Sequence, residues 1–511
     1  MTKFDIPSID YAAIAPILIV LGMAVVAVLL EAFLPRKVRR PVQLVLVFVT
    51  LIAAFLTVIG LAGTRTLVAA GSIAIDGPGL YLQGLILLVA IFGAMLLAER
   101  RLDPAGDAFA PRASALPGSE DELQFTKRGF FQTEIWPLFL FSVGGMLLFP
   151  VANDLLIMFV ALEVMSLPLY LLAGMARRRR LLSQEAAMKY FVLGAFASAF
   201  FLYGSALLYG FAGSISFPEI ADAMAAKPGD NGLLVAGIAL VVIGLLFKIA
   251  AVPFHQWTPD VYQGAPTPLT GFMAAGVKVA AFGALLRMLY VTLGGARWDW
   301  TPMLWVISII TMLVGSIIAV AQSDIKRMLA YSAIAQAGFI LIGVIAASPA
   351  GLAAAMFYLA AYSFITIGAF AIVTMVRDAT GEANDLEKWK GLGKKSPWIG
   401  AIFAIFMLAL AGIPLTTGFV AKFAVFSAGI ASGAAVLVIV GVIASVISAF
   451  FYARVIVLMF FVEPTERTAD VVVPSAFTTI ALAVAAAVTV ILGVIPQPLL
   501  DLAAKADIFI R

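Results

Sequence analysis

Residues 247–263 read FKIAAVPFHQWTPDVYQ, a sequence that combines membrane-like and helix-breaking features. It is apolar enough for a membrane helix, yet it contains Lys248, Pro253, Pro259 and His255, which is the only histidine in the chain. A proline inside a helix removes a backbone donor and clashes with the carbonyl four residues earlier. A charge at mid-membrane costs at least about 2.5–3.5 kcal/mol. We therefore expect a membrane helix that is broken at its prolines for a functional reason.

The composition of the whole chain agrees with a membrane location. Of its 511 residues, 63% are hydrophobic and 12% are charged, whereas soluble domains are about 45–50% apolar and about 25% charged. This predicts an all-α polytopic membrane protein that forms a single transmembrane domain over residues 1–511. The chain has no cysteine, which excludes disulfides and cysteine-held iron–sulfur clusters, and a single histidine excludes a bis-histidine haem.

Apolar windows of about 20 residues predict fourteen transmembrane spans. They lie near residues 11–34, 41–62, 78–98, 133–150, 154–175, 185–211, 232–254, 268–293, 302–321, 326–347, 351–376, 398–427, 432–461 and 473–495.

The basic residues predict the orientation of these spans. The loops at 35–41, 99–129, 176–180, 323–327 and 377–397 hold most of the Lys and Arg, and they share one side if the spans alternate. That side has 21 basic residues and the other has 6, so the positive-inside rule makes it cytoplasmic. Both termini are then expected on the periplasmic side. The longest loop, 103–129, is rich in Pro, Gly and Ala and is interpreted as a flexible cytoplasmic excursion.

Several charges fall deep inside the predicted spans. Glu163 and Lys278 are about ten residues in, which at about 1.5 Å per residue is near mid-membrane. Lys248 precedes Pro253, Lys422 follows Pro414 by eight residues, and Lys189 is shallower, on the cytoplasmic side. A lone lysine near a helix end usually extends to the interface, and Arg287 and Arg454 are equally explained as anchors or lipid-facing charges. Deep charges in several separate helices favour a functional role over a purely structural one.

A row of buried acids and amines can transfer protons. Burial raises the pKa of a carboxyl group and lowers the pKa of an amine, and a nearby opposite charge reverses both effects. Glu163 and Lys189 flank the short turn at 176–183, so we expect adjacent antiparallel helices in which the lysine reaches toward the carboxylate. Lys248 and Lys278 flank a second short connection. Water between these groups could be ordered by the side chains of Tyr190, Ser332, Gln336, Thr416 and Thr417, each of which is equally explained by helix packing.

Two spans are interrupted by proline, at AAVPFHQWTP in the seventh and at LALAGIPLTTGF in the twelfth. Each break has an intramembrane lysine nearby. The two spans are five positions apart in the order of helices and have opposite orientations. This predicts two inverted five-helix repeats, helices 4–8 (133–293) and helices 9–13 (302–461). Helices 1–3 and helix 14 lie outside the repeats. Broken helices at matching positions of two halves indicate a transport site.

Three segments carry a resemblance to a known family. FKIAAVPFHQWTPDVYQGAPTPLTGFMAAGVKVAAFG (247–283), SDIKRMLAYSAIAQAGFIL (323–341) and LALAGIPLTTGFVAKFAVF (408–426) closely resemble the antiporter-like membrane subunits of bacterial proton-pumping NADH–quinone oxidoreductase, respiratory complex I. The resemblance implies a Glu–Lys pair at Glu163 and Lys189. It also implies a lysine and a histidine at the first break (Lys248 and His255), a central lysine (Lys278) and a terminal lysine (Lys422). Gln336 stands where relatives often have a histidine, so a relay step there would need water or the amide.

The resemblance also implies the partners. FMN, iron–sulfur clusters and quinone are expected on other complex I subunits, so this chain would be a translocase subunit without its own redox centre or metal. Neighbouring antiporter-like and small membrane-arm subunits and membrane lipids are the expected partners, nucleic acid is not, and the location is the bacterial inner membrane. Two alternatives stay open: a subunit of a multisubunit cation/proton antiporter, and a purely structural membrane subunit whose charges hold the bundle together.

Overall fold

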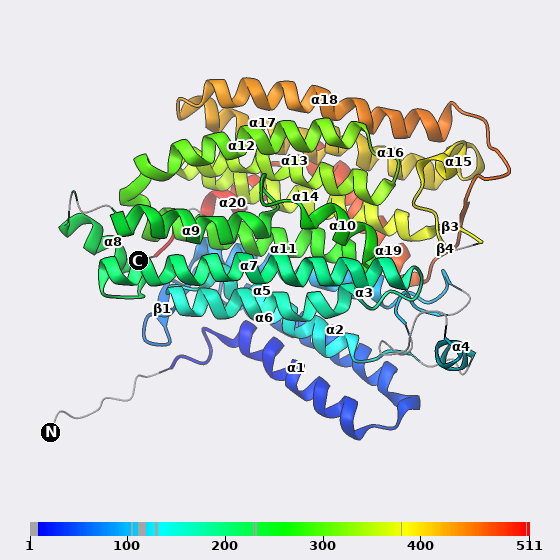
Figure 1. Cartoon of the computed structure of the whole chain (residues 1–511), viewed down its shortest axis with the longest axis horizontal. Coiled ribbons are helices and arrows are strands. Elements are labelled where there is room, and N and C mark those ends of the chain that lie inside the picture. Colours follow the sequence, from blue (N-terminus) through cyan, green and yellow to red (C-terminus); the bar gives the residue numbers. More distant parts are fainter. Residues whose placement is uncertain are drawn as a thin grey trace.

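The chain forms one bundle of long, roughly parallel helices in its computed structural model (Figure 1). The structure describes residues 9–103, 106–110, 119–127, 131–227, 229, 232–379, 381–506 and 508–510. Strands are confined to the ends of the bundle in this part of the chain. There β1 (Thr66–Val68) pairs with β2 (Ile73–Ile75), and β3 (Val376–Asp378) lies between β4 (Gly381–Glu382) and β5 (Asp470–Val471). The predicted all-α membrane architecture is confirmed.

Fourteen membrane crossings can be followed through the described residues. Twelve helices are long and apolar enough to cross a membrane, and the shorter α5 and the two-part α16–α17 complete the set. In chain order the crossings are α1 (Ala15–Phe33), α2 (Arg36–Gly60), α3 (Gly77–Leu97), α5 (Ile135–Leu148), α6 (Leu155–Ala173), α7 (Arg180–Ala212), α9 (Gly232–Ile249) with α10 (Trp257–Gly264), α11 (Thr267–Arg287), α12 (Arg297–Val320), α13 (Ile325–Ile345), α14 (Pro349–Met375), α16 (Pro397–Ala411) with α17 (Thr417–Ala431), α18 (Ala435–Phe460) and α19 (Ala476–Val494).

Four short α-helices complete the connections and ends of the bundle in the part of the chain that the structure describes: α4 (Glu120–Lys127), α8 (Phe217–Ala226), α15 (Leu392–Lys395) and α20 (Gln497–Lys505). Phe149–Val151 and Leu386–Trp389 form 3₁₀ turns. A π-helical turn, Met288–Thr292, and a 3₁₀ turn, Gly294–Ala296, join α11 to α12.

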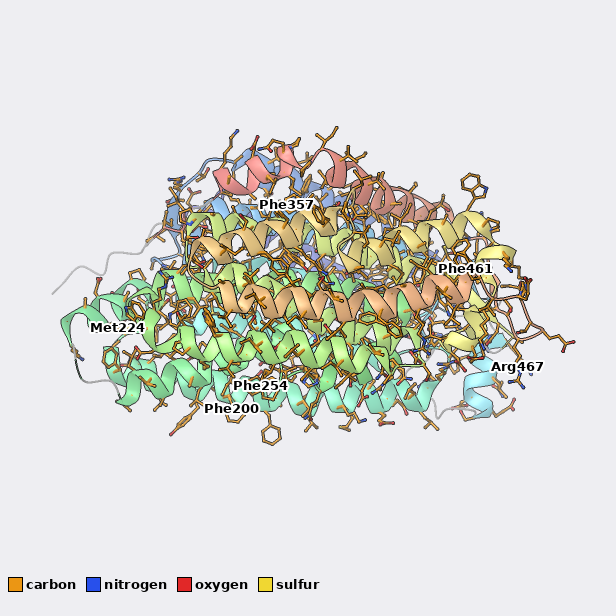
Figure 2. The ribbon with its side chains drawn as sticks, turned by 90° about the horizontal axis from the view of Figure 1, so that it is seen from above. Phe200, Met224, Phe254, Phe357, Phe461 and Arg467 are labelled. Atoms are coloured by element: carbon orange, nitrogen blue, oxygen red, sulfur yellow. The ribbon has the colours of Figure 1, made fainter. Side chains whose placement is uncertain are left out.

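Three helices, α11, α13 and α14, form the centre of the bundle and are almost entirely buried, whereas α1 and α19 are mostly exposed. Apolar side chains project from the outer helices, including Phe200 on α7 and Phe461 after α18 (Figure 2). In water such a surface would be unfavourable, but it suits contact with lipid or with other apolar subunits. The lysine-bearing helix α11 therefore lies in the driest part of the molecule.

Both predicted helix breaks are present. In the first, α9 ends at Ile249 and α10 begins at Trp257, and the backbone is held by two bonds: Val252 N donates to Thr311 Oγ1 (2.9 Å) and Trp257 Nε1 donates to the Phe247 carbonyl (2.9 Å). In the second, α16 ends at Ala411 and the chain passes through two residues with positive φ, Gly412 and Leu415, before α17. Side chains of the protein thus replace the hydrogen bonds that the breaks remove, as a membrane interior requires. The division into inverted repeats stays a prediction.

One end of the bundle collects most of the charged loops, and we call it the basic end. It comprises residues 99–103, 106–110, 174–179, 322–327, 376–379, 381–396 and 461–475. Bridges between Phe109 and Ala176 and between Asp324 and Asp385 join these segments, together with the β3–β5 pairing. The start of the loop predicted to be flexible is anchored here: Asp103 binds Arg178 and Arg377, and Asp107 binds Arg177. Residues 104–105, 111–118 and 128–130 of that loop lie outside the described residues.

Candidate functional site

Lys248 lies on the last turn of α9, just before the first break, and its side chain is buried. Its Nζ donates to Ser166 Oγ (2.7 Å) and to Tyr170 OH (3.2 Å), both on α6. The rings of Tyr170, Tyr190 and Phe247 surround it at 5.3–5.6 Å from Nζ to the ring centres. All of these contacts are with neutral groups, which solvate an ammonium without fixing its charge as a salt bridge would.

Glu163 lies one turn before Ser166 on the same helix. Within the part of the chain that the structure describes, its buried Oε1 has no hydrogen-bond partner. It interacts electrostatically with Lys248, although these two groups form no salt bridge within 4.0 Å. The Ser166 hydroxyl, one turn further along α6, accepts from Lys248 and donates to the Leu162 carbonyl. Among the described residues, a buried carboxylate oxygen without a hydrogen-bond partner thus lies one helical turn from the serine that binds the buried amine.

The predicted contact between Glu163 and Lys189 is wrong. Lys189 Nζ instead binds Glu185 one turn earlier on α7 (2.7 Å) and Asp260 on α10 (2.8 Å), and its side chain is 43% exposed. Arg327 at the start of α13 also binds Asp260, at 2.6 Å. The reason is the packing of α10 against α7, which brings a closer carboxylate to Lys189 than the one on α6.

His255 lies in the gap between α9 and α10 and is half-buried. Its ring centre is 6.4 Å from that of Tyr331 on α13, and its Nδ1 is buried with no hydrogen-bond partner among the described residues. The histidine is therefore at the break, as predicted, with its ring near Tyr331 and Nδ1 without a hydrogen-bond partner among the described residues.

Lys278 occupies the middle of the buried helix α11. Its Nζ donates to the carbonyl of Ala333 on α13 and lies 5.0 Å from the ring centre of Tyr362 on α14. Among the described residues it has no carboxylate partner within 4.0 Å. Like Lys248, it is a buried lysine whose contacts are all with neutral groups.

A network of neutral polar side chains follows on α13, next to Ala333. Ser332 Oγ and Tyr452 OH are hydrogen-bonded, Tyr358 OH donates to Gln336 Oε1, and Gln336 Nε2 lies 3.4 Å from Tyr452 OH. Gln336 Nε2 also donates to the carbonyl of Leu410, near the end of α16 (3.0 Å). Gln336 thus links the central helices to the second break, while its amide is fixed by three partners.

Lys422 ends this series, on α17 just after the second break. Its Nζ donates to the Ala411 carbonyl (2.9 Å) and to Ser445 Oγ (2.7 Å), and it lies 4.7 Å from the ring centre of Phe339. Ala411 is the last residue of α16, and carbonyls at a helix C-terminus lack intrahelical donors and attract a cation. Thr416 and Thr417 instead donate to backbone carbonyls, of Ile413 and Thr489, and have packing roles.

Other charged residues have roles that their sequence context did not reveal. Asp260 lies within the stretch that predicts the first break, but nothing in the sequence indicates that it binds both Lys189 and Arg327. Arg287 is fully buried and binds Asp76 at the start of α3 (2.7 Å). Arg454 donates to the carbonyl of Val320 (3.0 Å). Both arginines are therefore anchored to protein groups.

Comparison with known proteins identifies the family. Residues 152–448 match the sequence profile of the NADH:quinone oxidoreductase/Mrp antiporter transmembrane family, and the chain belongs to that family. Within it, the chain is 58% identical to NADH-quinone oxidoreductase subunit N of Rhodococcus opacus, over 99% of this chain and 97% of the relative. This agrees with the sequence of the first break, the lysine after the second break, the PQPLL stretch at 496–500 and the fourteen spans, all of which predict subunit N.

Solved structures agree with the sequence comparison. A chain of respiratory complex I from Thermus thermophilus superposes with a TM-score of 0.77 at 32% identity, covering 96% of this chain and 99% of that one. A chain of the Mrp complex from Dietzia superposes with a TM-score of 0.81 at 25% identity, covering 98% and 97%. The fold is therefore shared by both kinds of complex, and the sequence identity favours the first.

Proposed function

We propose that this chain moves protons across the membrane through Glu163, Lys248, Lys278 and Lys422, as a membrane-arm subunit of NADH–quinone oxidoreductase. One observation carries the proposal: three buried lysines on three crossings have only neutral contacts within 4.0 Å. A purely structural charge in a membrane interior is normally paired. Lysines without a close carboxylate can gain and lose a proton without breaking a salt bridge.

The residues have distinct roles in this proposal. Glu163 and Lys248, which interact electrostatically, exchange a proton between α6 and α9. Lys278 receives it at the centre, and Lys422 holds it against the free carbonyl of Ala411 before release. Lys189 is not part of this row of residues in our proposal, because it binds Asp260, close to the basic end. His255 sits beside the first break with Nδ1 unengaged, where it can order water between the two halves.

The chain acts as one part of a larger translocase. FMN, iron–sulfur clusters and quinone belong to partner subunits in this proposal, and for the clusters this agrees with the lack of cysteine in the chain. Its direct neighbours are other antiporter-like and small membrane-arm subunits and lipids, which suit the apolar outer surface. We assign the basic end to the cytoplasm and both termini to the periplasm. Glu163 and Lys248 interact electrostatically, so redox-driven changes elsewhere in the complex that alter the charge of either group can shift protons here.

The decisive test removes the proton-exchanging groups in the assembled complex. Glu163→Gln and Lys248→Met should assemble normally, and NADH-driven acidification of proteoliposomes should be lost or strongly slowed. Lys390→Met is the control, because this lysine lies on the surface of the basic end and binds Glu387. Full pumping in both interior variants would rule out the proposed path. Acidification that depended on added Na⁺ would instead favour the cation/proton antiporter alternative.

A further inference from the structure

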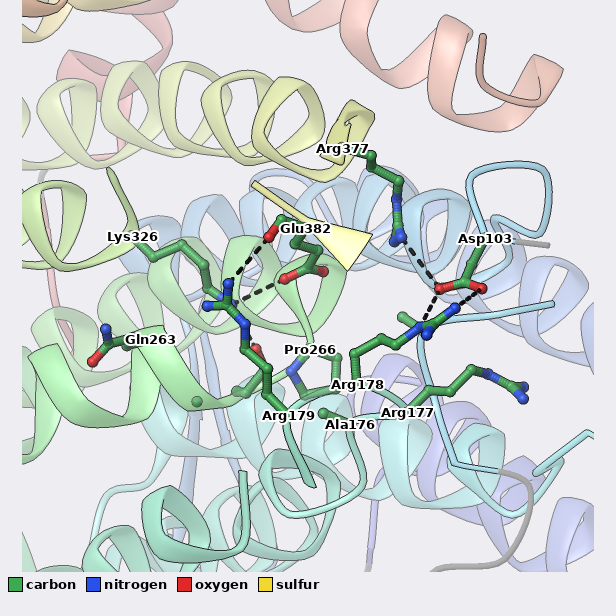
Figure 3. A pocket seen from close by; sticks show the side chains of 13 residues that line it. Asp103, Ala176, Arg177, Arg178, Arg179, Gln263, Pro266, Lys326, Arg377 and Glu382 are labelled. Atoms are coloured by element: carbon green, nitrogen blue, oxygen red, sulfur yellow. Dashed lines mark hydrogen bonds and ion pairs between the residues drawn. The ribbon is translucent and has the colours of Figure 1, made fainter. Parts of the chain in front are cut away.

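A small cavity opens at the basic end, where four connections meet (Figure 3). It is bounded by the 176–179 turn, the 263–266 turn between α10 and α11, the start of α13 and the β3–β4 hairpin. Its volume is about 30 Å³, and one water needs only about 10–15 Å³ when polar groups surround it. The charged side chains in its lining are Asp103, Arg177, Arg178, Arg179, Lys326, Arg377 and Glu382. The cavity suits water and is too small for an organic ligand.

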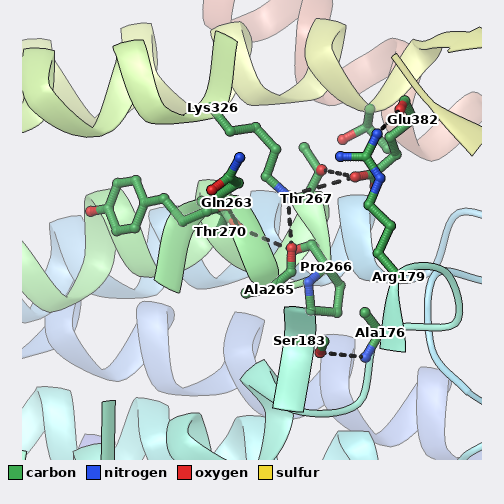
Figure 4. Close-up of polar contacts among 12 residues, drawn as sticks. Ala176, Arg179, Ser183, Gln263, Ala265, Pro266, Thr267, Thr270, Lys326 and Glu382 are labelled. Atoms are coloured by element: carbon green, nitrogen blue, oxygen red, sulfur yellow. Dashed lines mark hydrogen bonds and ion pairs between the residues drawn. The ribbon is translucent and has the colours of Figure 1, made fainter. Parts of the chain in front are cut away.

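Lys326 closes the inner side of this cavity. It lies on the first turn of α13, and its side chain is only 1% exposed. Its Nζ donates to the Ala265 carbonyl (2.7 Å) and lies 3.6 Å from Glu382 Oε2, an oxygen that also accepts from Thr267 Oγ1 (2.6 Å), as Figure 4 shows. Burial alone raises the pKa of Glu382, but the charge of Lys326 and the bond from Thr267 outweigh it and hold that pKa below its usual value.

Three other charged residues, Asp324, Arg179 and Arg377, interact with this pair. Asp324 on the same helix and Arg179 from the 176–179 turn both interact electrostatically with Lys326. Arg377 on β3 interacts with Glu382, and Arg179 donates to the Glu382 backbone carbonyl (3.3 Å). The Lys326–Glu382 pair thus has charged neighbours at the start of α13, on the 176–179 turn and on β3. The cavity connects the pair to the loops of the basic end.

The other lysines near the basic end differ from Lys326. Lys388, Lys390, Lys394 and Lys395 also bind carboxylates, but their side chains are 28–42% exposed. Water and the surface carboxylates are sufficient to stabilise the charges of those four lysines. Burying an ion pair costs free energy that its own attraction often does not recover, so a buried pair next to a water-sized cavity needs a separate explanation.

The pair stands at the head of the helix that carries Lys278. Ala265 lies in the turn before α11 and Thr267 is the first residue of that helix. Lys278 follows Thr267 by eleven residues, or about 16 Å of helix. Polar groups occupy the interval. The Thr270 hydroxyl is shared between the carbonyls of Pro266 (3.2 Å) and Tyr262 (3.3 Å), and the ring centre of Tyr362 lies 5.0 Å from Lys278 Nζ.

We propose that Lys326 and Glu382 form a proton-loading pair that feeds Lys278 from the basic end, separately from Glu163 and Lys248. An N–H bond of the Lys326 ammonium breaks as water on the inner side, near Thr270, takes the proton. The neutral amine then forms a new N–H bond with a proton from hydronium in the cavity, which leaves water there, and the hydronium on the inner side gives its proton to the neutral amine of Lys278. Glu382 stays a carboxylate throughout and stabilises the ammonium. This inference rests on the proposed function, because it supplies an entrance to the same row of lysines.

Arginine distinguishes proton loading from a structural ion pair. In the intact complex, Lys326→Arg keeps the positive charge opposite Glu382, but a guanidinium does not release its proton in proteins. A purely structural role predicts normal pumping in this variant. Proton loading predicts normal assembly with NADH-driven acidification at least about tenfold slower, since a positioned proton-transfer group typically contributes about 10²–10⁴-fold. Lys390→Arg, at the exposed Glu387 pair, should pump like the wild type.

Each outcome decides the proposal. Wild-type pumping in an assembled Lys326→Arg complex overturns it. If Lys326→Arg does not assemble, Glu382→Gln replaces it, because it keeps the acceptor for Thr267 and removes the charge that stabilises the ammonium; slowed pumping supports the loading pair and normal pumping overturns it. Glu163→Gln measured in parallel separates the two proposals: a defect there with normal Lys326→Arg pumping removes only the second entrance.

Discussion

Lys422 Nζ lies 2.9 Å from the carbonyl oxygen of Ala411, the residue at which α16 ends. A broken helix thus supplies a free carbonyl, and the next half-helix supplies the cation that binds it. At the first break the arrangement differs, because Lys248 precedes the break and donates to side-chain hydroxyls of α6. The two breaks therefore present their lysines in different ways, one to the backbone and one to a neighbouring helix.

Gly412→Ala should disturb Lys422 without changing any charge. Gly412 has φ +84°, and an added Cβ would lie 2.8 Å from Lys422 Cδ. The strain of the left-handed conformation is about 1–2 kcal/mol for a residue with a Cβ, and the clash displaces the lysine from Ala411. We expect slower proton pumping in an assembled complex. Gly433 has a similar φ and open space around it. Gly433→Ala is therefore the matched control, which introduces the same backbone strain but no clash with a lysine.

Ser166→Ala should slow the exchange between Glu163 and Lys248. It removes the closest hydrogen-bond acceptor of Lys248 and leaves Tyr170 as the remaining one, and losing a bond to a charged group costs about 1.5–3 kcal/mol. The acidification rate of proteoliposomes is the measurement. Ser205→Ala removes a buried hydroxyl that only donates back to its own helix, to Phe201, and should have no effect. Equal effects of the two substitutions would contradict a specific role for Ser166.

Tyr452→Phe tests the polar network between Lys278 and Lys422. The Tyr452 hydroxyl contacts both Ser332 and Gln336, and no other group among the described residues joins those two side chains. We expect pumping to fall several-fold while the ring keeps the packing intact. Tyr209→Phe, at an exposed position on α7, controls for loss of a hydroxyl. A Tyr452→Phe complex that pumps normally would show that protons bypass this network.

Arg287→Met should destabilise the end of the bundle opposite the basic end. Arg287 and Asp76 form an ion pair with no exposed side-chain surface, and removing one partner of such a pair typically costs about 3–5 kcal/mol. The melting temperature of the isolated complex is the measurement. The double variant Asp76→Asn with Arg287→Met should recover part of the loss, since it leaves no buried charge unpaired. A double variant less stable than Arg287→Met would contradict this account.

Glu99 predicts how stability depends on pH at the basic end. Burial raises its pKa, but hydrogen bonds from Thr478, from Arg101 N and from Ser475 outweigh burial and lower the pKa below the ordinary value. A depressed carboxylate pKa stabilises the fold above the unfolded pKa of about 4.3, and the effect is lost as pH falls through the folded pKa.

Glu99→Gln should therefore lower the melting temperature at pH 7, and the difference from wild type should shrink below about pH 4, near the unfolded carboxyl pKa. Glu463→Gln, at an exposed carboxylate bound to Lys394, should change little at either pH. A difference in melting temperature between Glu99→Gln and wild type that stays the same at both pH values would contradict a stabilising role for the charge of Glu99.

Most of the fold could be predicted because a membrane helix is recognised from the composition of one short segment. The apolar length of each span, the prolines of both breaks and the basic loops are properties of short segments, and the structure agrees with all fourteen spans. Individual contacts were less predictable. Lys189 and Glu163 flank one turn, which made their contact plausible, yet Asp260 lies 71 residues along the chain from Lys189 and takes its place.

The membrane bundle, its two broken helices and its deep lysines follow from the amino-acid sequence, because hydrophobicity, proline and charge act through their immediate neighbours. The groups that contact those lysines follow from the packing of the helices. Ser166, Ala333 and Ala411 give no signal in the sequence, since one is a common serine and the other two offer backbone carbonyls. A partner for a buried charge is selected by helix packing across the bundle, and packing sums many weak contacts between distant segments.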